Sequence, residues 1–139
     1  MPGRFWLVKS EPSAYSWQRF VGEGAAVWDG VKNPQARSNL AAMQKGDLVL
    51  FYHSGQGKDV VGVARVTRTA YPDPKGKDPR QVVVDLAPVA PLVQPVSLKE
   101  IKAEPRLAGI PLVRQSRLSV MELPKPAFDR ILALGATKL

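Results

Sequence analysis

The strongest β pattern lies in the middle of the chain. Residues 47–54, 60–71 and 81–89 are rich in Val, Leu and aromatic side chains, and polar stretches that contain Gly or Pro separate them. Short polar connections between successive strands are typical of antiparallel pairs, so this pattern predicts a meander of three strands. A weak alternation over residues 5–9 predicts another strand near the start of the chain. Residues 118–122 predict a short strand near its end.

Helices are expected between and after these strands, at residues 16–24, 34–46, 97–105 and 124–134. Ser97 is followed three residues later by Glu100, which is the spacing of a capping box. Pro34 suits the first turn of a helix, and Gly46 suits its end. Together the elements predict an α+β fold, a small antiparallel β-barrel with short flanking helices. The chain is expected to form a single domain over residues 1–139.

Length and composition are those of one ordinary globular domain. The chain has 139 residues, of which 45% are hydrophobic and 23% are charged. The apolar run at residues 5–8 is far shorter than the core of a signal peptide, and no run approaches the roughly 20 residues of a membrane helix. We therefore expect a cytoplasmic monomer, associated with the nucleoid if its target is DNA.

The scarcity of Cys and His excludes several kinds of site. The chain has no Cys, which removes disulfides, thiolate nucleophiles and cysteine zinc sites, and it has one His. We expect neither a metal nor a cofactor. No G-x-S-x-G elbow, Walker loop or G-x-G-x-x-G motif is present, and the acidic residues are scattered. Ser10, Ser54 and Ser119 are the possible nucleophiles and His53 the only imidazole base, but a surface or capping role is the favoured interpretation for each of them.

The net charge of +8 points to a polyanionic partner. A basic excess on a small domain favours nucleic acid, because neutralising phosphates releases counterions without any reading of sequence. The other interpretation is that the charge only keeps the protein soluble.

Three short groups of residues could form a pocket for a planar base. Such a pocket needs aromatic faces and a few well-placed polar groups, which are commonly held where ordered elements end. The groups are Lys9, Ser10 and Glu11; Trp28, Asp29 and Asn33; and Tyr52, His53 and Ser54. Taken alone, Trp28 is interpreted as a core residue before a pocket wall.

Long motifs in a fixed order give the chain a family resemblance. They are "FWLVKSEP", "VWDGVKNPQARSNLAAMQKGDLVLFYHS", "GVARVTRTAYPDP" and "LVRQSRLSVMEL". Over about residues 4–132 the chain resembles the EVE domain. The resemblance implies a PUA-like fold, kinship with the YTH domain and the reading of modified bases in DNA or RNA by base flipping. It implies a pocket formed by the three groups above, with Ser119 nearby. Pro34 stands where the family commonly has an aromatic residue.

The hypothesis that follows is a non-catalytic reader of a modified base. Trp28 would stack on the flipped base, and Ser10, Asn33, His53 and Ser119 would read its edge. Glu11 would accept from an exocyclic amine. Basic side chains would contact the phosphates, namely Lys32, Arg37, Lys75, Lys77, Arg80, Arg114 and Arg117.

Other functions stay open. Arg37 and Arg117 could instead tie internal segments to backbone carbonyls. A hydrolase of the PUA-like group would use Glu11, Asp29 or His53. A small-molecule sensor or a protein-interaction module would leave the positive charge without a role.

Overall fold

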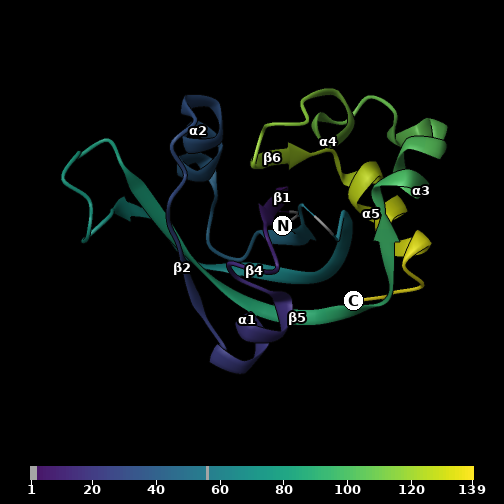
Figure 1. Ribbon diagram of the computed structural model, residues 1–139, viewed down its shortest axis with the longest axis horizontal. Coiled ribbons are helices and arrows are strands. Elements are labelled where there is room, and N and C mark those ends of the chain that lie inside the picture. Colours follow the sequence, from purple (N-terminus) through teal and green to yellow (C-terminus); the bar gives the residue numbers. More distant parts are fainter. Residues whose placement is uncertain (1–2, 56) are drawn as a thin grey trace.

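The computed structural model describes residues 3–55 and 57–139, and it shows an α+β fold with one mixed sheet (Figure 1). The strands are β1 (Phe5–Ser10), β2 (Ala26–Trp28), β3 (Leu48–His53), β4 (Asp59–Pro72), β5 (Val82–Ser97) and β6 (Val120–Leu123). The helices are α1 (Trp17–Glu23), α2 (Pro34–Ala42), α3 (Leu98–Ala103), α4 (Pro111–Arg114) and α5 (Lys125–Leu134), with a 3₁₀ turn at Pro105–Leu107. No helix in the described part of the chain has the length and apolar character needed to cross a membrane.

The predicted meander of three strands is confirmed. β3 pairs with β4 and β4 pairs with β5, both antiparallel. The loop between β4 and β5 extends from one end of the molecule, beside α2 (Figure 1, left).

The prediction of an antiparallel barrel is wrong for one pair of strands, and the closing of the sheet into a barrel is not confirmed. β1 runs parallel to β3, and it is antiparallel only to β6. A parallel pair needs a long crossover, and residues 11–47 supply one that contains α1, β2 and α2. The strand order is β2-β5-β4-β3-β1-β6, so the sheet of the described residues has two edges, β2 and β6.

β5 continues well past the predicted end at residue 89. Three prolines, Pro88, Pro91 and Pro95, made this part of the chain look like a boundary. Among the described residues, β2 pairs with β5 only at residues 84–86, and farther along β5 has β4 as its only sheet neighbour. The pairing register with β4 also shifts in this stretch. Proline is tolerated at such edges and bulges because its missing N–H has no sheet partner there.

The predicted helices form, with one end misplaced. The capping box is confirmed, because Ser97 Oγ accepts from Glu100 N at 3.0 Å and Ser97 N donates to Glu100 Oε1 at 3.2 Å. The C-terminal helix, α5, buries its apolar face as expected. α2 stops at Ala42 instead of reaching Gly46, because the next residue is extended and Gln44 N donates to the Asp47 carboxylate instead of continuing the helix.

Asp47 ties three segments together beneath the sheet. Its side chain is only 3% exposed. The carboxylate accepts from the Trp6 indole Nε1 at 2.9 Å, from Gln44 N at 2.9 Å and from Arg4 N at 3.1 Å. Each contact satisfies a donor that would otherwise lose water on folding. The start of β1 and the turn after α2 are therefore joined through one buried carboxylate.

Removing this carboxylate should destabilise the fold strongly. We expect Asp47→Ala to lower the free energy of unfolding by about 2–4 kcal/mol, because it leaves the buried Trp6 indole N–H without an acceptor. Urea unfolding followed by tryptophan fluorescence measures this. The control is Asp129→Ala, whose exposed carboxylate pairs with Lys125 within α5 and should change stability by less than about 0.5 kcal/mol. Equal effects of the two variants would show that Asp47 is not a structural anchor.

Candidate functional site

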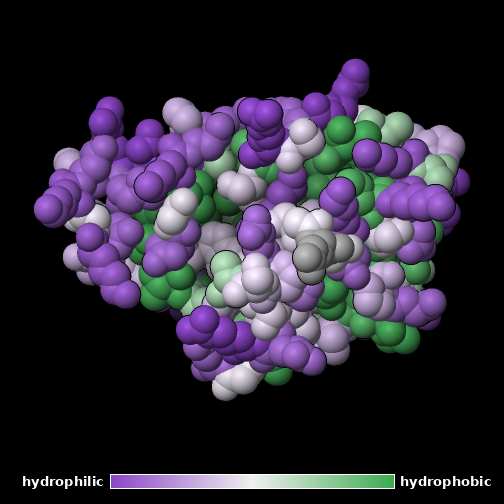
Figure 2. Space-filling view, in the orientation of Figure 1, coloured by the Kyte–Doolittle hydropathy of each residue, from purple (hydrophilic) through white to green (hydrophobic). Residues whose placement is uncertain are grey.

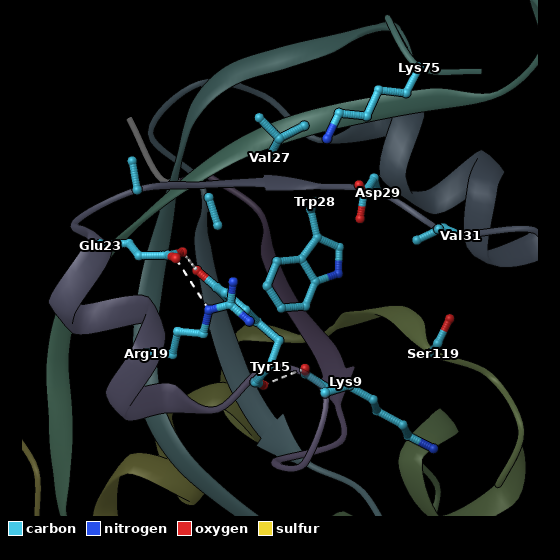
Figure 3. A pocket seen from close by; sticks show the side chains of 15 residues that line it. Lys9, Tyr15, Arg19, Glu23, Val27, Trp28, Asp29, Val31, Lys75 and Ser119 are labelled. Atoms are coloured by element: carbon cyan, nitrogen blue, oxygen red, sulfur yellow. Dashed lines mark hydrogen bonds and ion pairs between the residues drawn. The ribbon is translucent and has the colours of Figure 1, made fainter.

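A pocket of about 640 Å³ opens beside β2 (Figure 3). Its wall is built from the turn before α1, from α1 itself, from β2 and the residues after it, and from the ends of two other strands. The lining residues are Lys9, Ser10, Ala14, Tyr15, Arg19, Glu23, the continuous segment 25–31, Lys75 and Ser119. The volume lies within the range of about 300–1,000 Å³ that is usual for small-ligand sites.

Trp28 is both a core residue and part of the pocket wall. Only 7% of its surface is exposed. Its ring meets Phe51 edge to face, with centroids 5.5 Å apart, and makes similar contacts with Tyr15 at 6.2 Å and Phe20 at 6.5 Å. Figure 3 shows the indole projecting from β2 between Tyr15 on one side and Val31 on the other. The packing holds the indole in one orientation before any ligand arrives.

On one side of the pocket, hydrogen bonds between polar side chains hold them in fixed positions. The Tyr15 hydroxyl donates to Glu23 Oε1 at 2.7 Å, and Arg19 Nε donates to Glu23 Oε2 at 3.2 Å. Burial, followed by the Glu23 hydrogen bond, raises the pKa of Tyr15 to about 12. The same hydrogen bond is the main cause of the lowered pKa of Glu23, with Arg19 second. Tyr15 is therefore neutral and Glu23 charged at neutral pH.

The opposite side joins the ends of β1 and β6. Lys9 N donates to Ser119 O at 3.0 Å, and the Lys9 ammonium donates to Ser116 O at 2.9 Å. Burial lowers the pKa of Lys9. Ser10 Oγ donates to Tyr15 O at 2.6 Å, which fixes the turn that carries Tyr15. Asp29 and Lys75 stand at the outer rim, and both are exposed (Figure 3).

The structure brings together half of the ten residues expected in the pocket. Those that line it are Lys9, Ser10, Trp28, Asp29 and Ser119. Glu11 and Ser54 line a separate hollow of about 230 Å³ instead. Ser10 is the last residue of β1, whereas Glu11 begins the turn before α1, where its carbonyl accepts from Ala14 N and Tyr15 N. Glu11 is therefore not placed to accept from a base held beside Trp28.

Three further members of the expected pocket have structural contacts. Asn33 caps α2, where its Oδ1 accepts from Ala36 N at 3.0 Å. Tyr52 is only 3% exposed and lies in the core. His53 Nε2 accepts from Trp17 N at 3.0 Å, at the start of α1. None of the three is among the lining residues of the pocket.

Sequence reasoning missed the wall supplied by α1. Arg19 and Glu23 are four residues apart, the spacing that aligns side chains along one helix face, and Tyr15 precedes them by the same interval in the turn before α1. That regular spacing was the available signal. Val27 and Val31 also line the pocket, and only the three-dimensional course of β2 reveals them.

The expected phosphate contacts are spread over two regions. Lys75 lines the pocket, whereas Arg114 and Arg117 line a neighbouring hollow. The Arg80 guanidinium is held by Asp78 at 3.0 Å. The remaining candidates, Lys32, Arg37 and Lys77, lie on or near α2 and the β4–β5 loop. Figure 2 shows hydrophilic side chains concentrated on that end of the molecule (left).

Metal ligands do not gather anywhere in residues 3–55 and 57–139, where no group of three or more His, Cys, Asp or Glu side chains comes together.

Comparisons with known proteins give one consistent set of relatives. The family described as the EVE domain matches residues 4–134. Thymocyte nuclear protein 1 of the mouse, Mus musculus, is 32% identical over 168 residues, which cover 96% of this chain and 74% of the mouse protein. A solved structure from Rhodopseudomonas palustris has a TM-score of 0.92 at 42% identity, over 96% of this chain and 93% of that chain.

Two further solved structures contain nucleic acid. The human THYN1 protein in complex with DNA containing 5-methylcytosine has a TM-score of 0.88 at 28% identity, over 98% of this chain and 99% of that chain. The YTH domain of Zygosaccharomyces rouxii MRB1 in complex with N6-methyladenosine RNA has a TM-score of 0.62 at 18% identity, over 98% of this chain and 88% of that chain. The second likeness shows a shared fold.

The Trp17 ring packs directly against Gly62, so a side chain added at position 62 should clash with the ring. A Cβ at Gly62 would lie 2.5 Å from the Trp17 ring, so we expect Gly62→Ala to destabilise the protein by about 1–3 kcal/mol. Gly22, inside α1, has open space at its Cβ position, and Gly22→Ala should stabilise the protein by about 0.5–1 kcal/mol. Urea unfolding of both variants tests this opposition of sign. A neutral Gly62→Ala would mean that Trp17 is free to move off the strand.

Acidification should weaken the fold through His53. Burial lowers the pKa of His53 below its ordinary value of 6.5, although Asp59 opposes the shift. The unfolded chain therefore binds the proton more readily, so stability should fall as the pH drops through 6.5 towards the lower folded pKa. We expect urea unfolding of the wild type between pH 7.5 and 5.5 to show this loss.

The variant His53→Gln isolates the effect, because it keeps an acceptor for Trp17 N and leaves a chain without any imidazole. Its stability should change less over the same pH range. An unchanged slope would show that His53 does not cause the pH dependence. Asp59 cannot account for such a loss, because burial raises its pKa and a raised carboxyl pKa stabilises the fold on acidification.

Proposed function

This chain belongs to the EVE domain family, and on that premise we propose that it binds nucleic acid and holds one modified base in the pocket beside Trp28, without changing it chemically. The pocket carries the proposal, because it combines a fixed aromatic wall with carboxylates and cations at its rim. The human relative in complex with 5-methylcytosine DNA supports the same class of ligand.

A base would enter the pocket after leaving its stack. Flipping costs a few kcal/mol, and contact with an aromatic side chain returns about 1–3 kcal/mol. Trp28 exposes little surface, so the exposed Val27 and the partly buried Tyr15 ring complete the apolar contact. The pocket is held open by bonds within the protein, which reduces the ordering cost of binding.

The carboxylates of the pocket favour bases that carry an exocyclic amine. Glu23 and Asp29 line the pocket and can each accept a hydrogen bond. Cytosine and adenine present an amine donor, whereas thymine presents a carbonyl and a methyl group. We therefore propose that a modified cytosine or adenine is accepted in preference to thymine. Asp29 takes the role that the motif pattern had suggested for Glu11.

The side chains near the pocket fit binding better than catalysis. His53, the only imidazole of the chain, accepts a hydrogen bond from Trp17 N and lies outside the pocket lining. The Tyr15 hydroxyl, with its pKa of about 12, holds its proton at neutral pH. General acid–base catalysis works best with a group whose pKa lies near the working pH. This supports the proposal of a reader without turnover.

The proposal is tested by comparing matched oligonucleotides. Fluorescence anisotropy at a fixed salt concentration should show tighter binding of an oligonucleotide with 5-methylcytosine than of the same sequence with cytosine, as DNA or as RNA. Asp29→Ala should lower the affinity for the modified oligonucleotide about tenfold, the loss of one charge-assisted hydrogen bond. Removing a negative charge would otherwise strengthen binding to a polyanion, so a loss is diagnostic.

Two controls make the result unambiguous. Asp129→Ala removes an exposed carboxylate on α5, outside the pocket lining, and should leave the affinity unchanged or slightly higher. Trp28→Phe keeps an aromatic ring in the core and should reduce the preference for the modified base without unfolding the protein. Equal affinity of the wild type for modified and unmodified oligonucleotides would refute the pocket proposal and leave only phosphate binding.

A further inference from the structure

A second hollow of about 310 Å³ lies next to the pocket, and nothing in the base-binding proposal uses it. It is bounded by the start of α2 and by the residues after α4. Its lining consists of Asn33, Gln35, Arg114, Gln115, Ser116, Arg117 and Leu118. The lining contains two guanidinium groups and three amides but no carboxylate, so the hollow is suited to an anion.

The same two chain segments run from the pocket into this hollow. Val31 lines the pocket and Asn33 lines the hollow, two residues farther along. On the facing segment, Ser119 lines the pocket and Leu118 lines the hollow. Lys9 also joins them, because it lines the pocket while its ammonium donates to Ser116 O. A ligand in the pocket therefore has the hollow as its direct neighbour.

The two arginines of the hollow differ from others in the chain. Arg19 and Arg80 are each held by a carboxylate, at 3.2 and 3.0 Å. Arg114 and Arg117 are exposed, and within residues 3–55 and 57–139 neither has an ion-pair or side-chain hydrogen-bond partner. Their guanidinium groups are therefore free to bind a ligand. The alternative role for Arg117, tying an internal segment to the backbone, does not fit its exposure.

Carboxylates distinguish the two cavities, although both contain cationic side chains. The pocket carries the carboxylates of Glu23 and Asp29, which repel a phosphate and accept from an amine. The hollow presents only cationic and neutral groups. A nucleotide offers both kinds of partner at once, a base with donors and acceptors and a phosphodiester with a negative charge.

We infer that this hollow binds a backbone phosphate adjacent to the nucleotide whose base occupies the pocket. The inference rests on the proposed function. A guanidinium fork matches two oxygens of a phosphodiester, and charge-assisted bonds of this kind are strong and directional. Arg114 and Arg117 supply the forks, and the amides of Gln35 and Gln115 supply further donors. The phosphate contact sets the register of the strand, so that one chosen nucleotide meets the pocket.

Neutralising the two arginines should weaken binding without altering base preference. In the double variant Arg114→Gln/Arg117→Gln, the affinity for modified and unmodified oligonucleotides should fall by the same factor, about tenfold or more at physiological salt. The slope of log affinity against log salt should become shallower by about 0.7–0.9 for each phosphate that the variant no longer neutralises. The control Lys99→Gln/Lys102→Gln removes the same charge from the exposed face of α3, outside both cavities, and should change affinity much less.

A scan of the phosphate backbone locates the bound phosphate. Oligonucleotides with the modified base are prepared with one neutral methylphosphonate linkage at each position in turn. The wild type should lose affinity chiefly at a linkage adjacent to the modified nucleotide. The Arg114→Gln/Arg117→Gln variant should be insensitive to that same substitution, because the interaction is already absent.

The outcomes separate the two proposals. If the arginine variant behaves like the α3 control, or if its methylphosphonate profile matches that of the wild type, the hollow does not bind the adjacent phosphate, even when the base preference persists. If the wild type shows no base preference while the arginine variant loses affinity, the pocket proposal fails and the hollow is only part of a general phosphate surface.

Discussion

The packing of aromatic rings around Phe51 is the constraint on which the pocket depends. Phe51 is fully buried, and its ring stacks on Phe20 with centroids 5.4 Å apart. It also meets Trp17 at 5.3 Å and Trp28 at 5.5 Å, both edge to face. These contacts join β3 to α1 and β2, which are both short elements. Edge-to-face and offset ring pairs are directional, so the cluster orients the indole as well as burying it.

The topology of the sheet completes the site from distant parts of the chain. β1 lies between β3 and β6, parallel to the first and antiparallel to the second. The end of β1 therefore meets the start of β6, where Lys9 N donates to Ser119 O. Nearby, the β4–β5 loop reaches the segment after β2, and Gln81 Nε2 donates to Val31 O at 2.7 Å. A rigid sheet thus positions loop residues that are suited to binding.

The carboxylates of the site lie in the pocket and not in the adjacent hollow. Within a protein of net charge +8, the pocket retains two carboxylates, and one of them, Glu23, is held by Tyr15 and Arg19. The adjacent hollow has none. Long-range attraction of a polyanion comes from the whole charge distribution, whereas discrimination requires local groups of the right sign. The arrangement suits a protein that attracts any nucleic acid but accepts few bases.

Local patterns by themselves determined the family and the α+β class. They also determined the β3–β4–β5 meander, the capping box at Ser97 and the docking face of α5, because each depends on residues close together in the chain. They also pointed to Trp28, the end of β1 and the residue before β6, all of which line the pocket. Tertiary structure alone decided the parallel pairing of β1, the extension of β5 past its prolines and the side of the sheet that each residue faces. Ser10 ends β1 and lines the pocket, whereas Glu11 begins the turn before α1 and lines another hollow, a difference that their neighbouring positions in the sequence do not reveal. For the same reason, Trp28 could be assigned to both core and pocket only once the rings around it were in place.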